Sequence, residues 1–319
     1  MRRFEGGLAD QLTAFVAYKR SLGFAYDTEE AVLQRFDRWT LGIPGQHLEL
    51  TPELVDGWLV PGPMEGNRTR AGRISLMRQL AIYLSSMGHH AYVAESSQIA
   101  HPFRFVPHIF TPKELEAIFQ AADHLPPNRW TALPTVLPVI LRLLYGCGLR
   151  VSEATKLTVQ DLCWKDRTVA IRNSKFGKDR VVPMSDSVAT VCQSYAQAAH
   201  AASPPTTYFF CHRDGRAISP NTIYKRFRII LWQAGIAHGG PGVGPRVHDL
   251  RHSFAVHALK AAVDRQVDVY AALPLLSTYL GHASVLATEH YVRLTADAFP
   301  EICRALDHTT GWVIPGLEE

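Results

Sequence analysis

The spacing of apolar side chains predicts helices through most of the first hundred residues. Apolar positions in LADQLTAFVAYKRSLG recur every three or four residues, and the pattern stops at Gly23. In TEEAVLQRFDRWT, Thr28 is the expected N-cap, with acidic residues in the first turn. TPELVDGWL begins with Thr51 and Pro52, and NRTRAGRISLMRQLAIYLSSMG is a longer amphipathic stretch. Four helices with short connections predict a small helical bundle over residues 1–100.

The helical pattern is lost between residues 94 and 110, where prolines interrupt the stretch AESSQIAHPFRFVPHIF. We expect a linker at residues 101–110 and a second domain at residues 111–319. This domain should open with a helix, because Thr111 and Glu114 have the spacing of a capping box ahead of an apolar run.

One region of the second domain has the pattern of β-strands. In DLCWKDRTVAIRNSKFGKDRVVPM, turn material at residues 165–166 and 175–178 separates the apolar runs. This spacing predicts a three-stranded antiparallel sheet, and the chain is helical again after it. The expected fold class is therefore mainly α, with one small antiparallel sheet.

Composition limits the class of protein. Hydrophobic residues make up 47% of the 319 residues and charged residues 19%, which is typical of globular domains. The formal net charge of +4 permits a polyanionic partner. Five cysteines without a C-x-x-C pair argue against a disulfide framework and favour a reducing cytoplasm. We see no signal peptide and no apolar run that could span a membrane.

Two basic residues stand where they could reach a ligand. In YGCGLRVSEATKL, a helix ending near the glycines would place Arg150 at a break, with Glu153 close to it on a helical face. Lys175 would lie at the exposed tip of the predicted hairpin. Taken singly, the first pair is more often a helix cap with a surface ion pair, and the lysine is more often a solvated turn residue.

Histidines accompany a further arginine and a tyrosine. In VHDLRHSFAVHAL, His248 and Arg251 share one face of a helix. His248 and His252 have the H-x-x-x-H spacing of zinc ligands, but a glutamate is missing between them and a cation is present, so we expect no metal site. In TYLGHASVLATEHYVR, a Gly-His corner at His282 precedes a helix that carries Tyr291.

In combination, these residues follow the order found in the tyrosine recombinase (phage-type integrase) family. The sequence resembles that family over roughly residues 111–295, through GCGLRVSEATKLTVQDL, SKFGKDRVVPM, HDLRHSFAVHAL and LSTYLGHASVLATEHYVR. The resemblance implies a catalytic domain preceded by a core-binding (SAM-like) helical bundle that binds DNA. It also implies site-specific DNA recombination by strand cleavage and rejoining through a 3′-phosphotyrosyl intermediate.

The resemblance assigns the central chemical roles. Tyr291 would be the nucleophile, and its phenol, with an ordinary pKa of about 10, must lose its proton during attack. Arg150 and Arg251 would hold the non-bridging phosphate oxygens, because a guanidinium matches phosphate geometry and stays charged. Lys175 would protonate the leaving 5′-oxygen as a general acid.

Three further residues would support this reaction. His248 either accepts the proton of Tyr291 or donates a hydrogen bond to the phosphate, and the sequence leaves both roles open. His282 would donate to the phosphate. Glu153 would orient Arg150 or His248 without reacting itself.

The resemblance also bears on cofactors and partners. Rejoining conserves the energy of the phosphodiester, which fits the absence of a G-x-x-x-x-G-K-[ST] motif, and the arginines would replace a metal ion, so we expect no cofactor. The implied substrate is double-stranded DNA at recombination sites. The implied assembly is a homo-tetramer on two duplexes, mainly monomeric without DNA, with accessory recombinases or DNA-bending proteins as further partners.

The expected biological setting is an integrase or transposase of a mobile element in a prokaryotic cytoplasm, associated with the nucleoid. A type IB topoisomerase and a DNA-binding module that has lost catalysis are the alternatives. Candidate DNA-contacting residues are basic or polar and lie on predicted helices or the hairpin: Arg68, Arg70, Arg73, Lys178, Asn221, Thr222, Lys225, Arg226 and Arg228. The C-terminal segment DHTTGWVIPGLEE could reach a neighbouring copy.

Overall fold

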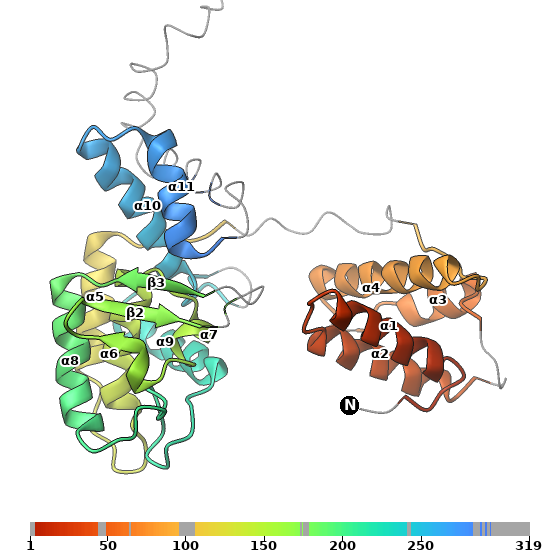
Figure 1. The fold of residues 1–319 in the computed structure, drawn as a ribbon, viewed down its shortest axis with the longest axis horizontal. Helices are drawn as coiled ribbons and strands as arrows, with labels where there is room; N and C mark the ends of the chain where they lie inside the picture. Colours follow the sequence, from red (N-terminus) through yellow and green to blue (C-terminus); the bar gives the residue numbers. More distant parts are fainter. Residues whose placement is uncertain are drawn as a thin grey trace, which may run out of the picture. The chain divides into compact units, whose positions relative to one another are not determined.

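The computed structural model describes residues 4–43, 49–63, 65–95, 106–172, 174, 179–240, 244–282, 288, 291 and 294. The chain divides into two compact units, Met1–Arg104 and Phe105–Glu319 (Figure 1). Each unit has its own buried apolar cluster, as separately folded domains do.

The first unit is a helical bundle. Its helices are α1 (Ala9–Ser21), α2 (Asp27–Thr40), α3 (Pro52–Leu59) and α4 (Asn67–Ser86). Their apolar faces bury Phe15, Leu33, Phe36 and Leu80 completely. The bundle expected from the apolar spacing is confirmed, because each of these side chains lies at the repeat of its helix.

The helix starts in this unit are set in two different ways. Thr51 caps α3 through its hydroxyl, which accepts a hydrogen bond from the third backbone N–H of the helix. The prediction that Thr28 caps α2 is wrong: the helix begins two residues earlier than that cap would place it, and Tyr26, at φ 58°, is its N-cap residue. The ring of Tyr26 is buried edge-on against Phe15, so core packing fixes this start.

The second unit is mainly helical. Its elements are α5 (Pro112–Asp123), α6 (Leu133–Gly146), α7 (Val151–Ala154), η2 (Val159–Asp161), β1 (Leu162–Cys163), β2 (Thr168–Ile171), β3 (Arg180–Pro183), α8 (Asp186–His200), α9 (Pro220–Gln233), α10 (Asp249–Asp264) and α11 (Val269–Leu280). The capping box predicted for α5 is present, since Thr111 and Glu114 exchange side-chain and backbone hydrogen bonds.

The predicted antiparallel sheet is confirmed. Its strand order is β1-β2-β3, and Val169 of β2 lies opposite Val182 of β3. Both valines are fully buried. Because side chains alternate along a strand, Arg180 shares the inward face with Val182. The expected hairpin tip at 175–178 lies outside the described residues.

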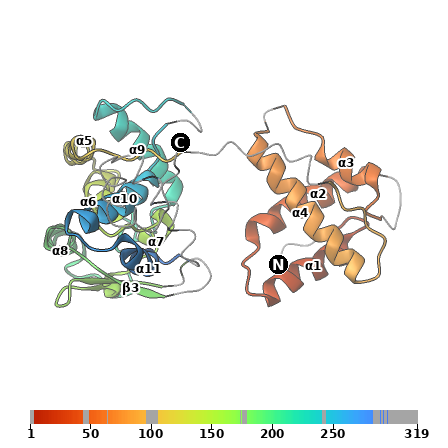
Figure 2. The same ribbon diagram turned by 90° about the horizontal axis from the view of Figure 1, so that it is seen from above.

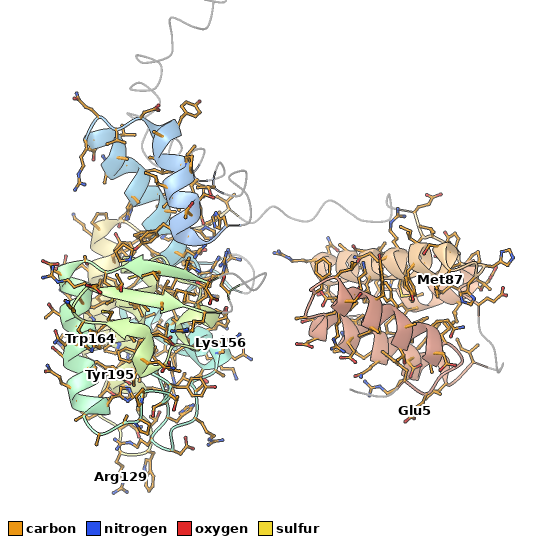
Figure 3. All side chains as sticks on the ribbon, viewed as in Figure 1. Glu5, Met87, Arg129, Lys156, Trp164 and Tyr195 are labelled. Carbon is orange, nitrogen blue, oxygen red and sulfur yellow. The ribbon has the colours of Figure 1, made fainter. Side chains whose placement is uncertain are left out.

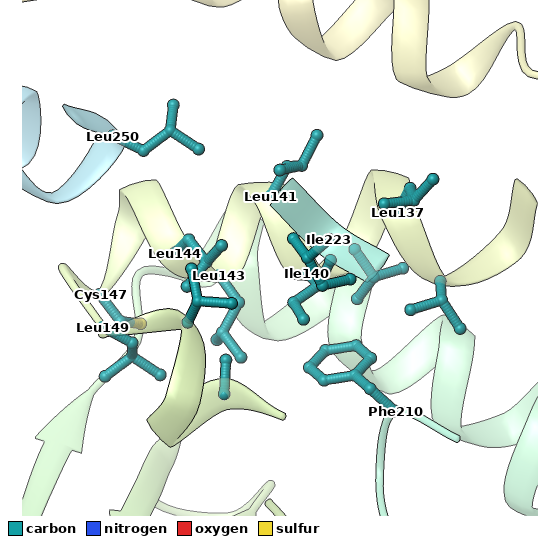
Figure 4. Packing of buried hydrophobic residues seen from close by; sticks show 14 of the residues in the cluster. Leu137, Ile140, Leu141, Leu143, Leu144, Cys147, Leu149, Phe210, Ile223 and Leu250 are labelled. Carbon is teal, nitrogen blue, oxygen red and sulfur yellow. The ribbon is translucent and has the colours of Figure 1, made fainter. Parts of the chain in front are cut away.

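Helix α6 is the centre of the second core. It contacts α5, α8 and α10, and its residues Leu137, Ile140 and Leu144 are almost completely buried. Figure 4 shows Leu250 of α10 beside one end of this row and Phe210 below its middle. In Figure 2, α6 and α10 lie between β3 and the pair α5 and α9. Helices α5, α8 and α10 are thereby held against one common helix.

Aromatic side chains connect the sheet to α8. Trp164 and Tyr195, both labelled in Figure 3, pack against Phe209 at centroid distances of 6.4 and 5.2 Å. The buried His200 hydrogen-bonds the carbonyl oxygen of Phe209 at 2.8 Å. These contacts hold the segment after α8 against the sheet.

The described end of the expected linker packs on the second unit. Phe110 is fully buried, and its N–H donates to Oγ of Ser253 at 2.8 Å. Ile109 packs against the apolar cluster of α10 and α11. Residues 106–110 are therefore part of the fold that carries the candidate site.

Candidate active site

A break between two helices positions Arg150. After α6 ends at Gly146, the chain turns through Gly148 with φ of +58°. A Cβ atom at Gly148 would lie 2.5 Å from Cδ1 of Phe254, so both the turn and the packing require glycine. Arg150 follows as the N-cap residue of α7, as the sequence predicted.

One carboxylate holds two guanidinium groups at this break. Glu153 accepts hydrogen bonds from the backbone N–H of Arg150 at 2.9 Å and from its Nη1 at 2.7 Å. It also accepts two bonds from Arg180, at 3.0 and 2.8 Å. Burial alone would raise the pKa of Glu153, but its bonds to Arg180 and Arg150 lower that pKa to about 2. The carboxylate is therefore ionised at neutral pH.

Arg251 is anchored in a different way. Its side chain is 1% exposed, and its Nη1 and Nη2 donate to the carbonyl oxygens of Gly148 at 2.6 Å and Leu280 at 2.8 Å. Burial and the nearby charge of Arg150 lower the pKa of Arg251 to about 10, so it stays protonated at neutral pH. These two carbonyl acceptors are neutral, so they fix the guanidinium without neutralising it.

The predicted nucleophile contacts a histidine that the sequence did not assign to it. Tyr291 is 3% exposed, and its hydroxyl lies 3.1 Å from Nδ1 of His252. Burial raises the pKa of Tyr291, and the charge of Arg251 opposes that rise. The phenol is thus protonated at neutral pH, with an imidazole in hydrogen-bonding contact.

Two further imidazoles lie in the same electropositive surroundings. Burial, together with the charges of Arg251 and Arg150, lowers the pKa values of both His248 and His282 to about 4. The ring of His282 stacks on Tyr291 at 5.9 Å. Both imidazoles are therefore neutral at pH 7 and available as proton acceptors or neutral hydrogen-bond donors.

The structure brings most of the predicted catalytic set together. The charges of Arg150 and Arg251 act on both of these histidines and on Tyr291. Arg150 and Arg180 share one carboxylate and Arg251 binds carbonyl oxygens, which leaves an excess of positive charge around a phenol and neutral imidazoles. Lys175 and Lys178 lie outside the described residues.

Sequence reasoning missed two members of this cluster. Arg180 received no role from the sequence, although its place on the inward face of β3 signals a charge that needs a buried partner. His252 was considered only as a zinc ligand. Its contact with Tyr291 depends on a separation of 39 residues along the chain, which the helical pattern could not predict.

The DNA-contact candidates of the first unit differ in exposure. Arg68 is exposed and Arg70 is half-buried, both in the first turns of α4. Arg73 is engaged internally: its guanidinium lies 4.6 Å from the ring centroid of Trp58 and pairs with Glu65 at 2.7 Å. The structure therefore separates Arg73, which joins α3 to α4, from the open Arg68.

The candidates on α9 form an exposed face. Asn221, Lys225, Arg226 and Arg228 are all exposed, and Thr222 is half-buried beside the N-cap Ser219. The opposite side of the helix carries fully buried apolar residues. The basic side of α9 is thus open to a ligand.

The described part of the chain contains neither a candidate metal site nor a candidate membrane-spanning helix. Its residues include no group of three or more His, Cys, Asp or Glu side chains that could hold a metal ion. Within the same residues, no helix combines the length and apolarity needed to cross a bilayer.

Comparison with known proteins identifies the family. The model of the phage integrase family matches residues 108–297, more than half of the chain. One relative is y4rB of Sinorhizobium fredii, which is named as an integrase/recombinase. It is 29% identical to this chain over 302 residues, which cover 92% of this chain and 95% of the relative. Tyrosine recombinase XerA of Pyrococcus furiosus is 32% identical over 163 residues, covering 51% of this chain and 52% of the relative.

Solved structures show the same fold. The Tn1549 transposon integrase in complex with circular intermediate DNA has a TM-score of 0.64 at 15% identity, with 92% of this chain and 99% of that chain covered. A λ integrase dimer bound to a core site has a TM-score of 0.62 at 18% identity, with 89% and 76% covered. The chain belongs to the phage integrase family, and its enzyme class is that of the tyrosine-type site-specific recombinases.

Proposed function

We propose that this chain exchanges DNA strands at specific sites through a covalent bond between Tyr291 and a 3′-phosphate. The observation that supports this most strongly is the position of Arg251, a buried guanidinium held by two carbonyl oxygens beside the phenol. Burying a cation without matching it to its own carboxylate is costly, and a phosphate group would balance it.

The proposed cleavage step replaces one phosphorus–oxygen bond with another. The oxygen of Tyr291 forms a bond to phosphorus while the bond from phosphorus to the 5′-oxygen breaks. The phenolic proton passes to an imidazole, and the 5′-oxygen receives a proton from the ammonium group of Lys175. Arg150 and Arg251 stabilise the charge that develops on the non-bridging oxygens. Attack by a second 5′-hydroxyl reverses these transfers and joins a new strand.

The structure points to a different proton acceptor from the one considered in the sequence. His252 hydrogen-bonds the hydroxyl of Tyr291, whereas the sequence had left His248 open as either the proton acceptor or a donor to the phosphate. We assign proton acceptance to His252 and a phosphate hydrogen bond to His248, which is neutral at pH 7 and lies under the influence of both arginines. His282 would donate a second neutral hydrogen bond to the phosphate, and Glu153 would orient Arg150.

The reaction as proposed needs neither a metal ion nor a nucleotide. The arginines supply the positive charge that a metal supplies in other phosphoryl transfers, and rejoining recovers the energy of the broken bond.

The proposed partners follow from the relatives. The Tn1549 integrase bound to circular intermediate DNA and the λ integrase bound to a core site support double-stranded recombination sites as the substrate. Two joined duplexes require four active sites, so we propose a homo-tetramer on DNA and a monomer without it, with accessory DNA-bending proteins or recombinases. The exposed basic face of α9 supports direct DNA contact. A mobile element is the proposed setting, and the prokaryotic cytoplasm at the nucleoid is the proposed location.

The test uses duplexes that the protein itself selects from a randomised library by binding. A selected site is cloned once or twice into a supercoiled plasmid, which is then incubated with the protein. Deletion or inversion between two sites is the expected result. Relaxation of both plasmids without exchange would favour a topoisomerase, and binding without any change of topology would favour an inactive DNA-binding module.

A further inference from the structure

Arg180 lies in the site cluster but has no role in the reaction proposed above. We propose that Arg180, on β3, is a positioning residue that holds Glu153 and, through it, Arg150 in the geometry needed for cleavage. This inference rests on the proposed function, because Arg150 matters here only if it binds the phosphate.

The first support is the completeness of the Arg180 contacts. Its Nη1 and Nη2 donate to the two carboxylate oxygens of Glu153 at 3.0 and 2.8 Å, and its Nε donates to the carbonyl oxygen of Tyr279 at 3.0 Å. All three nitrogens of the guanidinium are therefore engaged by protein acceptors. A planar fork bound in this way fixes the orientation of a carboxylate as well as its charge.

The second support is that Glu153 passes this orientation to Arg150. The same carboxylate receives both the backbone N–H and Nη1 of Arg150. The side chain of Glu153 is 4% exposed, so water cannot easily replace either arginine as its partner. Without Arg180, the ionised Glu153 would keep only Arg150 as a strong partner and could draw its guanidinium away from the phosphate.

The third support comes from the end of α11. Gly281 has φ of +67°, and a Cβ atom there would lie 2.9 Å from Nη1 of Arg180. The carbonyl oxygen of Gly281 accepts a hydrogen bond from Nη2 of Arg150 at 3.2 Å. Arg180 thus packs against the turn that gives Arg150 its other anchor and that leads directly into His282.

Exposure separates the roles of the two arginines. The side chain of Arg150 is 21% exposed and that of Arg180 is 10% exposed, although both bind the same carboxylate. Arg150 is the one open to an incoming phosphate, and Arg180 lies behind it. The expected defect on losing Arg180 is therefore in the chemical step and not in DNA affinity.

The test measures single-turnover adduct formation on nicked duplexes of a library-selected site, with the DNA concentration for half-saturation measured separately. Arg180→Lys keeps the charge but loses the two-pronged bond, and it should slow adduct formation by at least about 10-fold. Half-saturation should stay within about 2-fold. Arg180→Gln provides a second variant with the same expectation if the lysine variant does not fold.

Arg142→Lys is the matched control. Arg142 binds both oxygens of Asp123, at 2.8 and 2.6 Å, in the same unit but outside the site cluster. Because the Arg142–Asp123 pair is more exposed than the Arg180–Glu153 pair, Arg142→Lys should lower the melting temperature no more than Arg180→Lys does, and it should leave adduct formation at the wild-type rate.

A double variant tests whether Arg180 acts through Glu153. Because both changes disturb one unit, Arg180→Lys combined with Glu153→Gln should be about as slow as Glu153→Gln alone. A wild-type rate in Arg180→Lys and Arg180→Gln, or two defects that multiply, would overturn the inference. If the wild type formed no adduct on DNA that it binds, the proposed function itself would fail, and the inference with it.

Discussion

Two arginines, Arg73 in the first unit and Arg251 in the second, are both withdrawn from solvent, but their surroundings differ. Arg73 lies over the ring of Trp58 and pairs with Glu65. Arg251 is fixed by two neutral carbonyl oxygens, and burial together with its charge lowers the pKa values of His248 and His282. The first charge is paired with a carboxylate, whereas the second is bound by neutral carbonyl oxygens, which fits the phosphate-binding role that we propose for it. The acceptors of a buried cation therefore say more about function than its burial does.

The largest effect should follow from removing the fork of Arg251. Arg251→Lys keeps a cation but cannot reach both carbonyl oxygens and a phosphate together. Adduct formation should fall by about 100-fold or more, the cost of losing one donor to a developing oxyanion. The measurement is the single-turnover rate at saturating DNA, and a rate within about 3-fold of wild type would remove the difference between the two arginines.

Replacing Arg73 should affect the stability of the protein and not the chemical step. Arg73→Met removes a partly buried charged hydrogen bond and should lower the free energy of unfolding by about 1–3 kcal/mol. Chemical denaturation of the full chain, monitored by tryptophan fluorescence because Trp58 lies under Arg73, provides the value. The adduct rate at saturating DNA should be unchanged, and a large rate defect without loss of stability would contradict the structural role.

The histidines of the site should also make the stability of the protein depend on pH. The folded pKa values of His248 and His282, about 4, lie below the ordinary value of 6.5. The unfolded chain therefore binds more protons between these limits, so the stability contribution is complete above about pH 6.5 and is lost as pH falls towards 4. The melting temperature should fall as the pH is lowered across this window, and His282→Gln should reduce the slope of melting temperature against pH.

His124→Gln removes an exposed imidazole from the same unit and serves as the matched control for that experiment. A slope that responds equally to both substitutions would argue against the electropositive surroundings of His282.

The smallest effect is expected at the open arginine of α4. Arg68 is exposed, so Arg68→Gln should leave stability unchanged within about 0.5 kcal/mol. If Arg68 contacts a phosphate, DNA binding should weaken uniformly across sequences, and the slope of log affinity against log salt should decrease by about 1. An unchanged slope would assign Arg68 to a solvated surface.

Much of the fold could be predicted because it depends on local pattern. The repeat of apolar residues gave the four helices of the first unit, and alternating strands with turn residues gave the sheet. The cap of α3 at Thr51 was visible in the sequence, whereas the start of α2 depends on how Tyr26 packs against Phe15. That contact joins separate helices, and no local pattern encodes it.

The site divides in the same way. Arg150, Arg251 and Tyr291 could be located from motifs, since each motif is contiguous in the sequence. The bonds that define their surroundings join distant segments: Arg251 to Gly148 across 103 residues, and Arg180 to Glu153 across 27. Such pairings are decided by tertiary packing, so the sequence could name the reacting groups but not what holds them.

The most direct test of the account compares the wild type with Tyr291→Phe on labelled, nicked duplexes that both proteins bind, in the presence of EDTA. The proposed phosphotyrosyl chemistry predicts a protein–DNA adduct that survives denaturation in the wild type and is absent from the variant, with mass spectrometry locating the nucleotide on Tyr291. An equal adduct in Tyr291→Phe, or none in the wild type on DNA that it binds, would contradict the proposed phosphotyrosyl chemistry.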